Sequence, residues 1–156
     1  MTPARIRVQA DDFDVGAETA RLSRGAPDVG AVATFVGYCR SEDGRLAALE
    51  IDHYPGMAEA EIGRVADEAQ GRWPLSGVTI IHRFGSIPAG GQIVFVGVAS
   101  RHRQAAFAAC EMLMDYMKSH APFWKRAVLT DGAKADWVEA AASDDDALKR
   151  WEAKKI

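Results

Sequence analysis

The sequence predicts an α+β fold, a sandwich in which helices pack against an antiparallel or mixed sheet. Strand-like and helix-like segments follow one another as strand, helix, two strands, helix, two strands, helix, strand and helix. Paired strands between helices favour such a sheet over a doubly wound parallel one, which requires stricter alternation. The 156 residues suit one core and contain no internal repeat or Pro/Ser-rich linker, so we expect residues 1–156 to form a single domain.

The chain is predicted to begin with a strand and a helix. Polar and apolar residues alternate from Arg5 to Val8, which is the pattern of a short strand. A helix is expected from about Val15 to Arg24, because the Asp14 carboxylate can accept hydrogen bonds from the free N–H groups of its first turn. Gly25 follows that helix and is typical of a helix end.

A hairpin is expected next. Residues 29–38 (VGAVATFVGY) are nearly all apolar and rich in β-branched side chains, which indicates a buried strand. Residues 46–54 are predicted to be its partner strand, because residues 41–44 (SEDG) between them have the composition of a turn.

The middle of the chain predicts a helix and two strands. The helix is expected to start at Pro55, whose missing N–H costs nothing there, and to run to about Trp73, before Pro74. Residues 78–84 and 92–100 are predicted strands, and the turn-rich residues 85–91 are predicted to be the loop between them.

A long helix is expected from residue 101 to residue 120, where Pro122 prevents its continuation, and residues 123–129 are predicted to form a last strand. A short helix from Ser143 or Asp144 through Trp151 completes the expected elements. The long helix carries an apolar stripe made of Phe107, Cys110, Leu113, Met114 and Met117.

Composition excludes several classes of protein. The net charge of −3 argues against a nucleic-acid-binding protein, which is usually basic. No apolar run approaches the ~20 residues that span a bilayer, and the N-terminus lacks the apolar region of a signal peptide. Cys39 and Cys110 stand far apart, which argues against a disulfide framework and fits a reducing compartment. We therefore expect a cytoplasmic protein with neither nucleic acid nor membrane as a partner.

The charge is unevenly distributed along the chain. Residues 101–126 contain five Lys or Arg and only two acids, whereas residues 131–146 contain six acids and one Lys. A basic middle beside an acidic tail suggests a local anion site, with a solvated helix face as the alternative.

Familiar catalytic and metal-binding motifs do not occur. The sequence has no GxSxG nucleophile elbow, no GxxxxGK[ST] phosphate loop and no HExxH zinc site. His53 and His82 fall in strand patterns without a nearby pair of ligands, so no metal site is predicted. Cys110 falls on the apolar stripe and is expected in the core, while Cys39 is either a thiol nucleophile or a small residue near a strand end.

Two basic groups are candidates for anion binding. Arg40 follows the predicted buried strand, and its planar guanidinium suits a phosphate or a carboxylate; a surface ion pair is the alternative. His102 and Arg103 stand at a strand-to-helix junction, where free N–H groups and the helix dipole favour an anion. The alternative for these two is that they extend past the helix end into solvent.

A third basic group is a pair of lysines among Met and aromatic residues. Lys118 stands near the end of the long helix and Lys125 in the strand that follows. A lysine in partly apolar surroundings has a lowered pKa, because burial disfavours the charged form, and it can then act as a base or a nucleophile. The alternatives are a helix C-cap for Lys118 and an exposed strand face for Lys125.

Seven segments occur in one order over about Val29 to Trp151. They are TFVGYCR (34–40), DHYPGM (52–57), RWPL (72–75), IHRFG (81–85), IVFVGVASRHR (93–103), MDYMKSHAPFWKR (114–126) and WVE (137–139). Each segment alone is weak, but together, and in this spacing, they resemble the large subunit of molybdopterin synthase.

That resemblance implies an α/β hammerhead fold and a sulfurtransferase. The family's enzyme converts cyclic pyranopterin monophosphate to molybdopterin by adding two sulfurs as a dithiolene. The resemblance implies a small ubiquitin-like subunit that carries the sulfur as a thiocarboxylate on its Gly-Gly C-terminus, which inserts into the large subunit. It also implies a heterotetramer, with a central homodimer of large subunits and one small subunit at each end. No metal and no other cofactor is expected for sulfur transfer.

The resemblance also assigns site residues. Lys118 and Lys125 match the catalytic lysines, and we expect Phe35 and Met117 to line an apolar channel for the partner's tail. Positions that match the family's substrate pocket are Tyr38, Cys39, Arg40, His102, Arg103, Lys118, Lys125 and Arg126. Cys39 stands where Val is usual, Ala127 where many members carry Glu, and Ala141 where some carry a basic residue. These departures concern the grip on the substrate and leave the two lysines unaffected.

The long helix predicts that each site is built from two copies of the chain. Fifteen residues separate Arg103 from Lys118, which at ~1.5 Å per residue is about 22 Å along the axis. The resemblance places both at one pocket, so we expect two helices to pack antiparallel; an elongated substrate spanning a single chain is the alternative. Two rival functions are a non-catalytic partner-binding scaffold and a phosphometabolite-binding domain, and the retained lysines, Arg40 and His102-Arg103 argue against an idle pocket.

Overall fold

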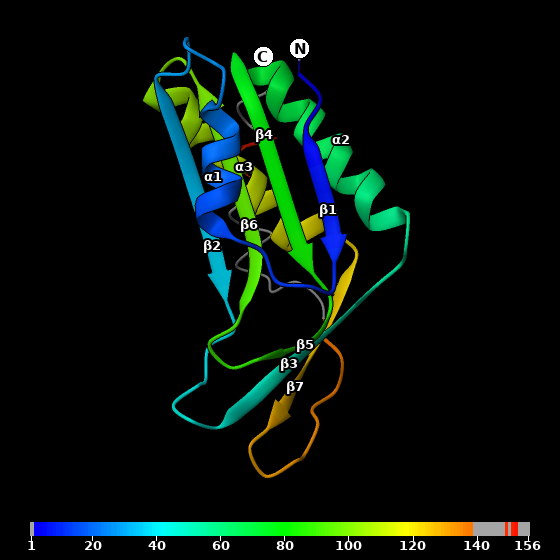
Figure 1. The fold of residues 1–156 in the computed structure, drawn as a ribbon. Helices are drawn as coiled ribbons and strands as arrows, with labels where there is room; N and C mark the ends of the chain where they lie inside the picture. Colours follow the sequence, from blue (N-terminus) through cyan, green and yellow to red (C-terminus); the bar gives the residue numbers. More distant parts are fainter. Residues whose placement is uncertain (1, 139–148, 150, 153–156) are drawn as a thin grey trace.

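The computed structural model describes residues 2–138, 149, 151 and 152 (Figure 1). Residues 2–138 form three helices and two sheets, which confirms the predicted α+β class. The helices are α1 (Val15–Ser23), α2 (Met57–Arg72) and α3 (Arg103–His120). The strands are β1 (Arg5–Gln9), β2 (Ala31–Tyr38), β3 (Leu46–His53), β4 (Leu75–Arg83), β5 (Gly85–Pro88), β6 (Gln92–Ser100) and β7 (Phe123–Leu129).

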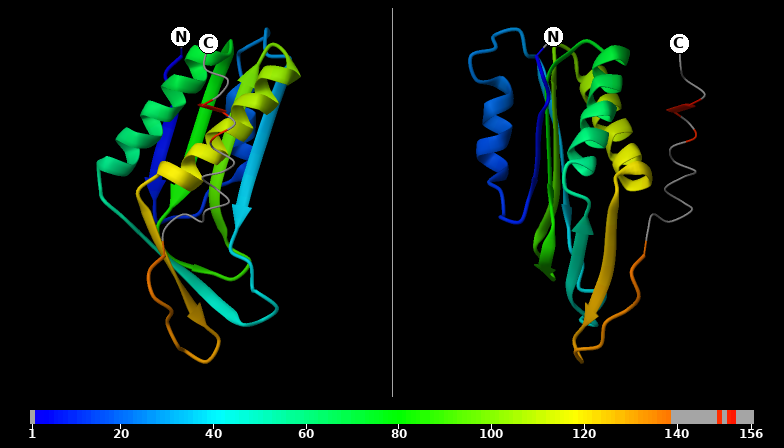
Figure 2. Two further views of the ribbon diagram at one scale, coloured as in Figure 1. Left: turned by 180° about the vertical axis from the view of Figure 1, so that it is seen from behind. Right: turned by 90° about the vertical axis from the view of Figure 1, so that its right-hand side faces the viewer.

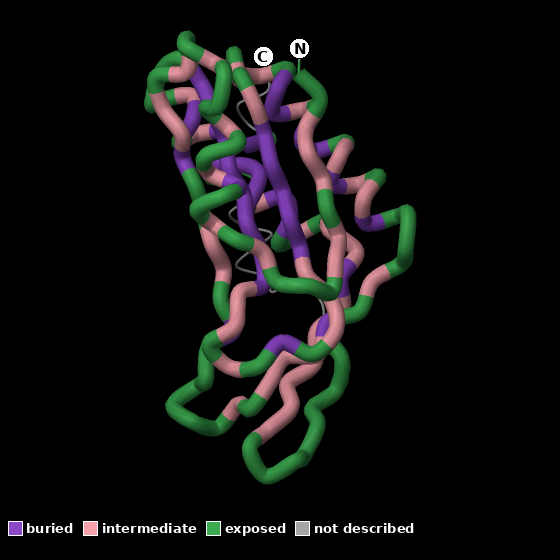
Figure 3. The backbone as a smooth tube through the Cα atoms, in the orientation of Figure 1, coloured by how far each residue is buried: buried purple, intermediate pink, exposed green. Residues whose placement is uncertain are grey.

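The larger sheet has the strand order β1-β4-β6-β2, with β1 parallel to β4 and the other pairs antiparallel. Helix α1 covers one face, and α2 and α3 cover the other (Figure 2). Because both faces are covered, the central strands are apolar along their length: β6 is buried from Ile93 to Ser100 and β4 from Val78 to His82 (Figure 3). The mixed sheet agrees with the prediction from the order of elements.

The smaller sheet has the order β5-β3-β7, is antiparallel throughout, and extends beyond one end of the larger sheet (Figure 1). Strand β3 leads into α2, and β7 follows α3. The helices that cover the larger sheet are therefore tied directly to the smaller one, and the junction of the two sheets lies at the C-terminal end of α3.

The predicted hairpin of residues 29–38 with 46–54 is wrong. Among the described residues β2 pairs with β6, whereas β3 pairs with β5 and β7 in the other sheet. The turn at 41–44 does exist, but Glu42, Asp43 and Gly44 have positive φ angles of 51°, 59° and 81°, and the turn carries the chain from one sheet to the other. Local turn chemistry predicts a reversal but not which neighbour each strand takes.

Strand β2 is also less buried than predicted. It lies at the edge of the larger sheet, and of its residues only Ala33 is buried, while 38% of Phe35 and 55% of Tyr38 are exposed. The predicted loop 85–91 likewise contains the short strand β5, which pairs with β3 from Ile51 to Ala48. Strand β5 has only four residues, begins with Gly and ends with Pro, so its alternation of polar and apolar residues is too short to predict a strand.

The helix boundaries agree with their local signals. Asp14 caps α1 by accepting the Ala17 N–H at 3.0 Å, and Gly25 follows with φ +70°. Helix α2 begins two residues after Pro55, where the Glu59 carboxylate accepts the Gly56 N–H at 2.7 Å. Helix α3 begins after His102 rather than at residue 101.

The predicted C-terminal helix lies largely outside the described residues. Of that stretch, Lys149, Trp151 and Glu152 are described and are helical. The buried indole of Trp151 donates to Asp115 of α3 at 2.5 Å, and Arg72 of α2 donates to the Trp151 carbonyl at 3.0 Å. Trp151 therefore anchors the end of the chain on the helical layer.

Candidate active site

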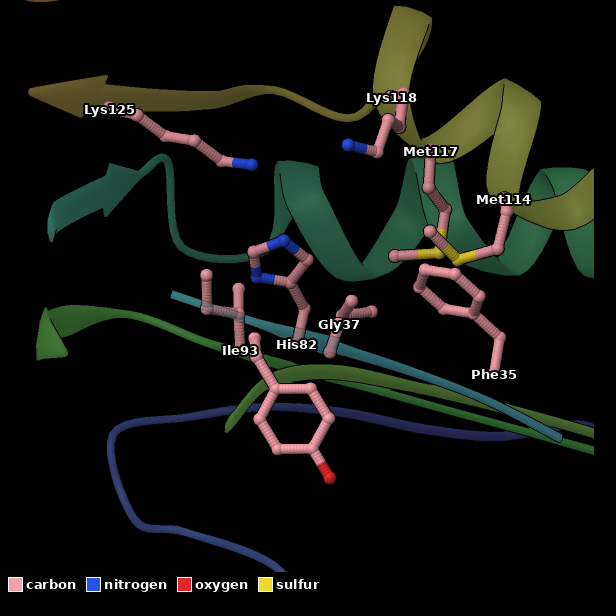
Figure 4. Close-up of a pocket in the computed structure, with 10 residues that line it drawn as sticks. Phe35, Gly37, His82, Ile93, Met114, Met117, Lys118 and Lys125 are labelled. Carbon is pink, nitrogen blue, oxygen red and sulfur yellow. The ribbon is translucent and has the colours of Figure 1, made fainter. Parts of the chain in front are cut away.

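A small pocket lies where the two sheets and the end of α3 meet (Figure 4). Its volume is about 80 Å³. Strands β2, β4 and β6 form its floor, and α3 and β7 close it from above. The lining residues are Phe35, Gly37, Tyr38, His82, Ile93, Val94, Met114, Met117, Lys118 and Lys125.

The structure brings the two candidate catalytic lysines into this one pocket. Lys118 lies in the last turn of α3, and Lys125 lies on β7 five residues after α3 ends. Their side chains extend from opposite sides across the top of the pocket, with the amino groups turned toward its centre (Figure 4). Because α3 ends at His120 and β7 continues over the pocket, two residues seven apart in sequence reach the same space (Figure 4).

The wall below the lysines is apolar. Phe35, Met114 and Met117 meet on one side of the pocket, and both methionines are buried (Figure 4). Phe35 and Met117, expected to line a channel for a partner's tail, both line this pocket. Lys118 is exposed and Lys125 is half-buried, so both amino groups are accessible beside this wall, and the arrangement suits an anionic sulfur or oxygen.

A groove of about 380 Å³ runs from this pocket along the edge of the larger sheet. It shares Phe35, Met114 and Lys118 with the pocket and continues between β2 and α3 to the exposed Phe107. Its remaining lining residues are Ala33, Thr34, Cys110, Glu111 and Asp115. The groove therefore leads from the surface to Lys118.

Sequence reasoning missed five of the ten lining residues, and His82 is the ionisable one among them. Only 5% of it is exposed, and its ring stacks on Phe123 with centroids 3.8 Å apart and planes 15° apart. Its Nδ1 lies 2.8 Å from the Arg83 carbonyl oxygen. Burial, followed by the charge of Lys125, lowers the pKa of His82 to about 3, so the imidazole is neutral. The available signal was an ionisable residue directly after the β-branched run Val78–Ile81 of a predicted strand.

The last residue of β2 and the two residues after it have different surroundings. Tyr38 lines the pocket, but Cys39 is buried and is not among the lining residues. Burial raises the pKa of the Cys39 thiol, which disfavours the nucleophilic thiolate. Arg40 is exposed and pairs with Glu42 at 3.2 Å, the surface ion pair that was its alternative interpretation.

Arg126 lies outside the pocket within a single chain. Side chains alternate along β7, so Lys125 and Arg126 leave the strand on opposite faces. The Arg126 guanidinium donates to Glu50 at 2.7 Å and lies 4.5 Å from the ring centroid of Trp137. Lys134 also contacts Glu50 at 2.9 Å, and these two cations lower the pKa of the Glu50 carboxyl.

His102 and Arg103 lie at the opposite end of α3 from the lysines, as the predicted helix required. Both are exposed, His102 as the N-cap residue and Arg103 as the first helical residue. One chain therefore contains the two lysines in one pocket, with His102 and Arg103 at a distance from it.

Metal-binding clusters and membrane-spanning helices are absent from the described part of the chain. No group of three or more His, Cys, Asp or Glu side chains there is arranged to hold a metal ion. None of the described helices combines the length and the apolar character needed to cross a membrane.

Comparison with known proteins gives a consistent result. Residues 8–120 match the family model described as MoaE protein. The chain is 60% identical to the molybdopterin synthase catalytic subunit of Mesorhizobium japonicum, over 94% of this chain and 92% of that one. It is 55% identical to the subunit of the same name from Brucella melitensis, over 96% and 92%. The solved structure of the molybdopterin biosynthesis MoaE protein from Burkholderia ambifaria matches with a TM-score of 0.83 at 47% identity, over 96% of this chain and 98% of that one.

Proposed function

The chain belongs to the MoaE protein family, and from this premise we propose that it is the catalytic, sulfur-transferring subunit of molybdopterin synthase. It is then a subunit of an enzyme of molybdopterin biosynthesis. The proposed reaction converts cyclic pyranopterin monophosphate to molybdopterin. The sulfur comes from the C-terminal thiocarboxylate of a small ubiquitin-like subunit.

One observation carries this proposal: two lysines share a pocket with an apolar wall. A thiocarboxylate is an anion, and two ammonium groups beside an apolar wall attract it. The apolar groove between β2 and α3 provides a path along which a narrow tail reaches Lys118. A tail that ends in Gly-Gly suits such a path because glycine has no side chain.

The substrate-binding positions outside the pocket fit a site built from two chains. Arg40 and Arg126 form ion pairs with Glu42 and Glu50, and His102 and Arg103 lie about one helix length from Lys118. We propose that a second copy supplies its His102 and Arg103 to the lysine pocket, within a homodimer that carries one small subunit at each end. Tyr38 is the remaining proposed substrate contact on the pocket itself.

Reconstitution tests the proposed function. The chain is mixed with the thiocarboxylated small subunit and cyclic pyranopterin monophosphate, and molybdopterin is measured. Formation of molybdopterin supports the sulfur-transfer function. Binding of both partners without product supports a non-catalytic scaffold, and binding of phosphorylated metabolites alone supports a phosphometabolite-binding domain.

A further inference from the structure

His82 is a polar side chain on the floor of the pocket. Neither the proposed role of the two lysines nor the family resemblance gives it a function. Its Nδ1 lies 2.8 Å from the main-chain carbonyl oxygen of Arg83. A carbonyl oxygen can only accept, so in the neutral ring Nδ1 carries the proton and donates it. The other ring nitrogen, Nε2, is then left with its lone pair.

That lone pair points into the pocket. Figure 4 shows the ring nitrogen farther from the main chain turned toward the amino groups of Lys118 and Lys125. Stacking on Phe123 at 3.8 Å fixes the plane of the ring. The ring is therefore held by a hydrogen bond and a stacking contact, and its Nε2 faces the two lysines.

The surroundings of His82 keep the ring uncharged. Burial lowers its pKa most, and the charges of Lys125 on β7, His53 on β3 and Lys118 on α3 lower it further, to about 3. The hydrogen bond with the Arg83 carbonyl acts in the opposite direction. At neutral pH Nε2 is consequently an acceptor and not a donor.

We propose that His82 is a positioning residue for the lysine pair, whose Nε2 is the uncharged acceptor toward which the ammonium groups of Lys118 and Lys125 are oriented. An ammonium group has three donors on a flexible four-carbon stem, so a fixed acceptor restricts where it rests. A carboxylate in the same place would neutralise the positive charge that an anionic sulfur requires, whereas a neutral imidazole leaves it intact. The role in sulfur transfer rests on the proposed function, while the orientation of the lysines does not.

The tautomer is tested first, on the intact chain with ¹⁵N-labelled histidine. We expect the His82 ring to be neutral from pH 5 to pH 8, with the proton on Nδ1 and none on Nε2. A proton on Nε2, or an imidazolium in this range, would overturn the proposal because no acceptor would then face the lysines.

Lysine reactivity is tested next, without sulfur chemistry. The rate at which acetic anhydride labels Lys118 and Lys125 at one fixed pH is measured by mass spectrometry. His82→Phe keeps the ring stack but has no acceptor, so the ammonium form loses a partner and labelling should become several-fold faster. His82→Gln offers an amide oxygen near the position of Nε2 and should stay near the wild-type rate.

Turnover is compared in the same variants. We expect His82→Phe to lower turnover roughly 10- to 100-fold with KM for the small subunit unchanged, and His82→Gln to restore most of it. The matched control is His53→Phe, since His53 lies in the same aromatic cluster, 6.0 Å from Phe123 and 4.5 Å from Phe84, but does not line the pocket. It should label and turn over as the wild type does.

The outcomes separate the two proposals. Wild-type labelling and turnover in His82→Phe would overturn the positioning role, as would equal losses in the Phe and Gln variants. A wild-type protein that makes no molybdopterin would count against the proposed function, and the tautomer and labelling results would still decide the role of His82.

Discussion

The imidazole of His82 lies flat on the ring of Phe123, with centroids 3.8 Å apart and an interplanar angle of 15°. His82 ends a buried run of β4, and Phe123 is the first residue of β7, so this contact joins the larger sheet to the smaller one. The lysine pocket is built directly beside that contact. Its geometry therefore depends on the packing of a histidine that must remain neutral.

This burial makes stability depend on pH. The pKa of His82 is about 3 in the folded chain, against 6.5 for an ordinary histidine. Between these values the unfolded chain binds one more proton, so the free energy of unfolding should decrease as pH falls from 6.5 toward 3. The expected contribution is about 1.4 kcal/mol per pH unit. Urea denaturation at several pH values measures it.

The control for that measurement is His82→Gln. Asp12, Glu50 and Glu61 also have lowered pKa values, so their protonation at low pH also decreases the free energy of unfolding. These three residues are the same in the wild type and the variant, so their contribution cancels in the comparison. The variant should therefore show a slope shallower than the wild type by about 1.4 kcal/mol per unit. Equal slopes would mean that His82 has the same pKa in the folded and the unfolded chain.

The sequence predicts best where the signal is local. The Asp14 cap, the prolines around α2 and α3 and the apolar alternation of β1 each act within a few residues, and those elements form near the predicted boundaries. Strand pairing is non-local, because β2 and β3 have similar local patterns but enter different sheets. The shared pocket of Lys118 and Lys125 was expected from resemblance and not from spacing, and no spacing rule brings His82 from β4 beneath them.

Lys118→Ala should abolish product formation while the fold and small-subunit binding survive. Lys118 lines both the pocket and the groove that leads to it. Loss of an interaction that is made only in the transition state lowers turnover more than it weakens binding. Lys125→Ala should be severe as well. Lys134→Ala, which removes a lysine paired with Glu50 outside the pocket, is the matched control. Turnover is measured as molybdopterin formed per site. Near-normal turnover in Lys118→Ala would exclude a catalytic role for Lys118.

Gly37→Ala should narrow the pocket. A methyl group there would lie 2.6 Å from Val94 Cγ1 and 3.3 Å from Phe35 Cε1, and both residues line the pocket. Such overpacking typically costs about 1–3 kcal/mol of stability, and we expect turnover to fall with it. Gly63→Ala on α2 is the control, because a Cβ there meets no atom within 4 Å and alanine favours a helix. Full activity and stability in Gly37→Ala would show that the pocket wall adjusts.

The small subunit should depend on its C-terminal tail. A tail without side chains suits a groove that Phe35 and Met114 line, because glycine adds no bulk to the backbone. Deleting the last two glycines of the partner should stop sulfur transfer, with the full-length partner assayed alongside. Molybdopterin formed at the same rate by the shortened partner would remove the tail-insertion mechanism.

Each active site should need two copies of this chain. Arg103 begins α3 and Lys118 lies in its last turn, about 22 Å apart along the axis, which one small phosphate does not span. If two copies pack with their α3 helices antiparallel, the Arg103 of one copy comes near the Lys118 of the other. Separately inactive Arg103→Ala and Lys118→Ala chains should therefore regain activity when mixed, because each mixed dimer has one site with both residues intact and one site with neither.

The size of that recovery follows from the same geometry. After random exchange in an equal mixture, half of the dimers are mixed and one of their two sites is wild type, so activity should reach about a quarter of the wild-type value. Mass spectrometry of intact dimers establishes that exchange has occurred. No recovery with exchange complete would mean that Arg103 and Lys118 must act from the same chain, in a pocket spanned by an elongated substrate, because only that arrangement leaves every site of a mixed dimer with one residue missing.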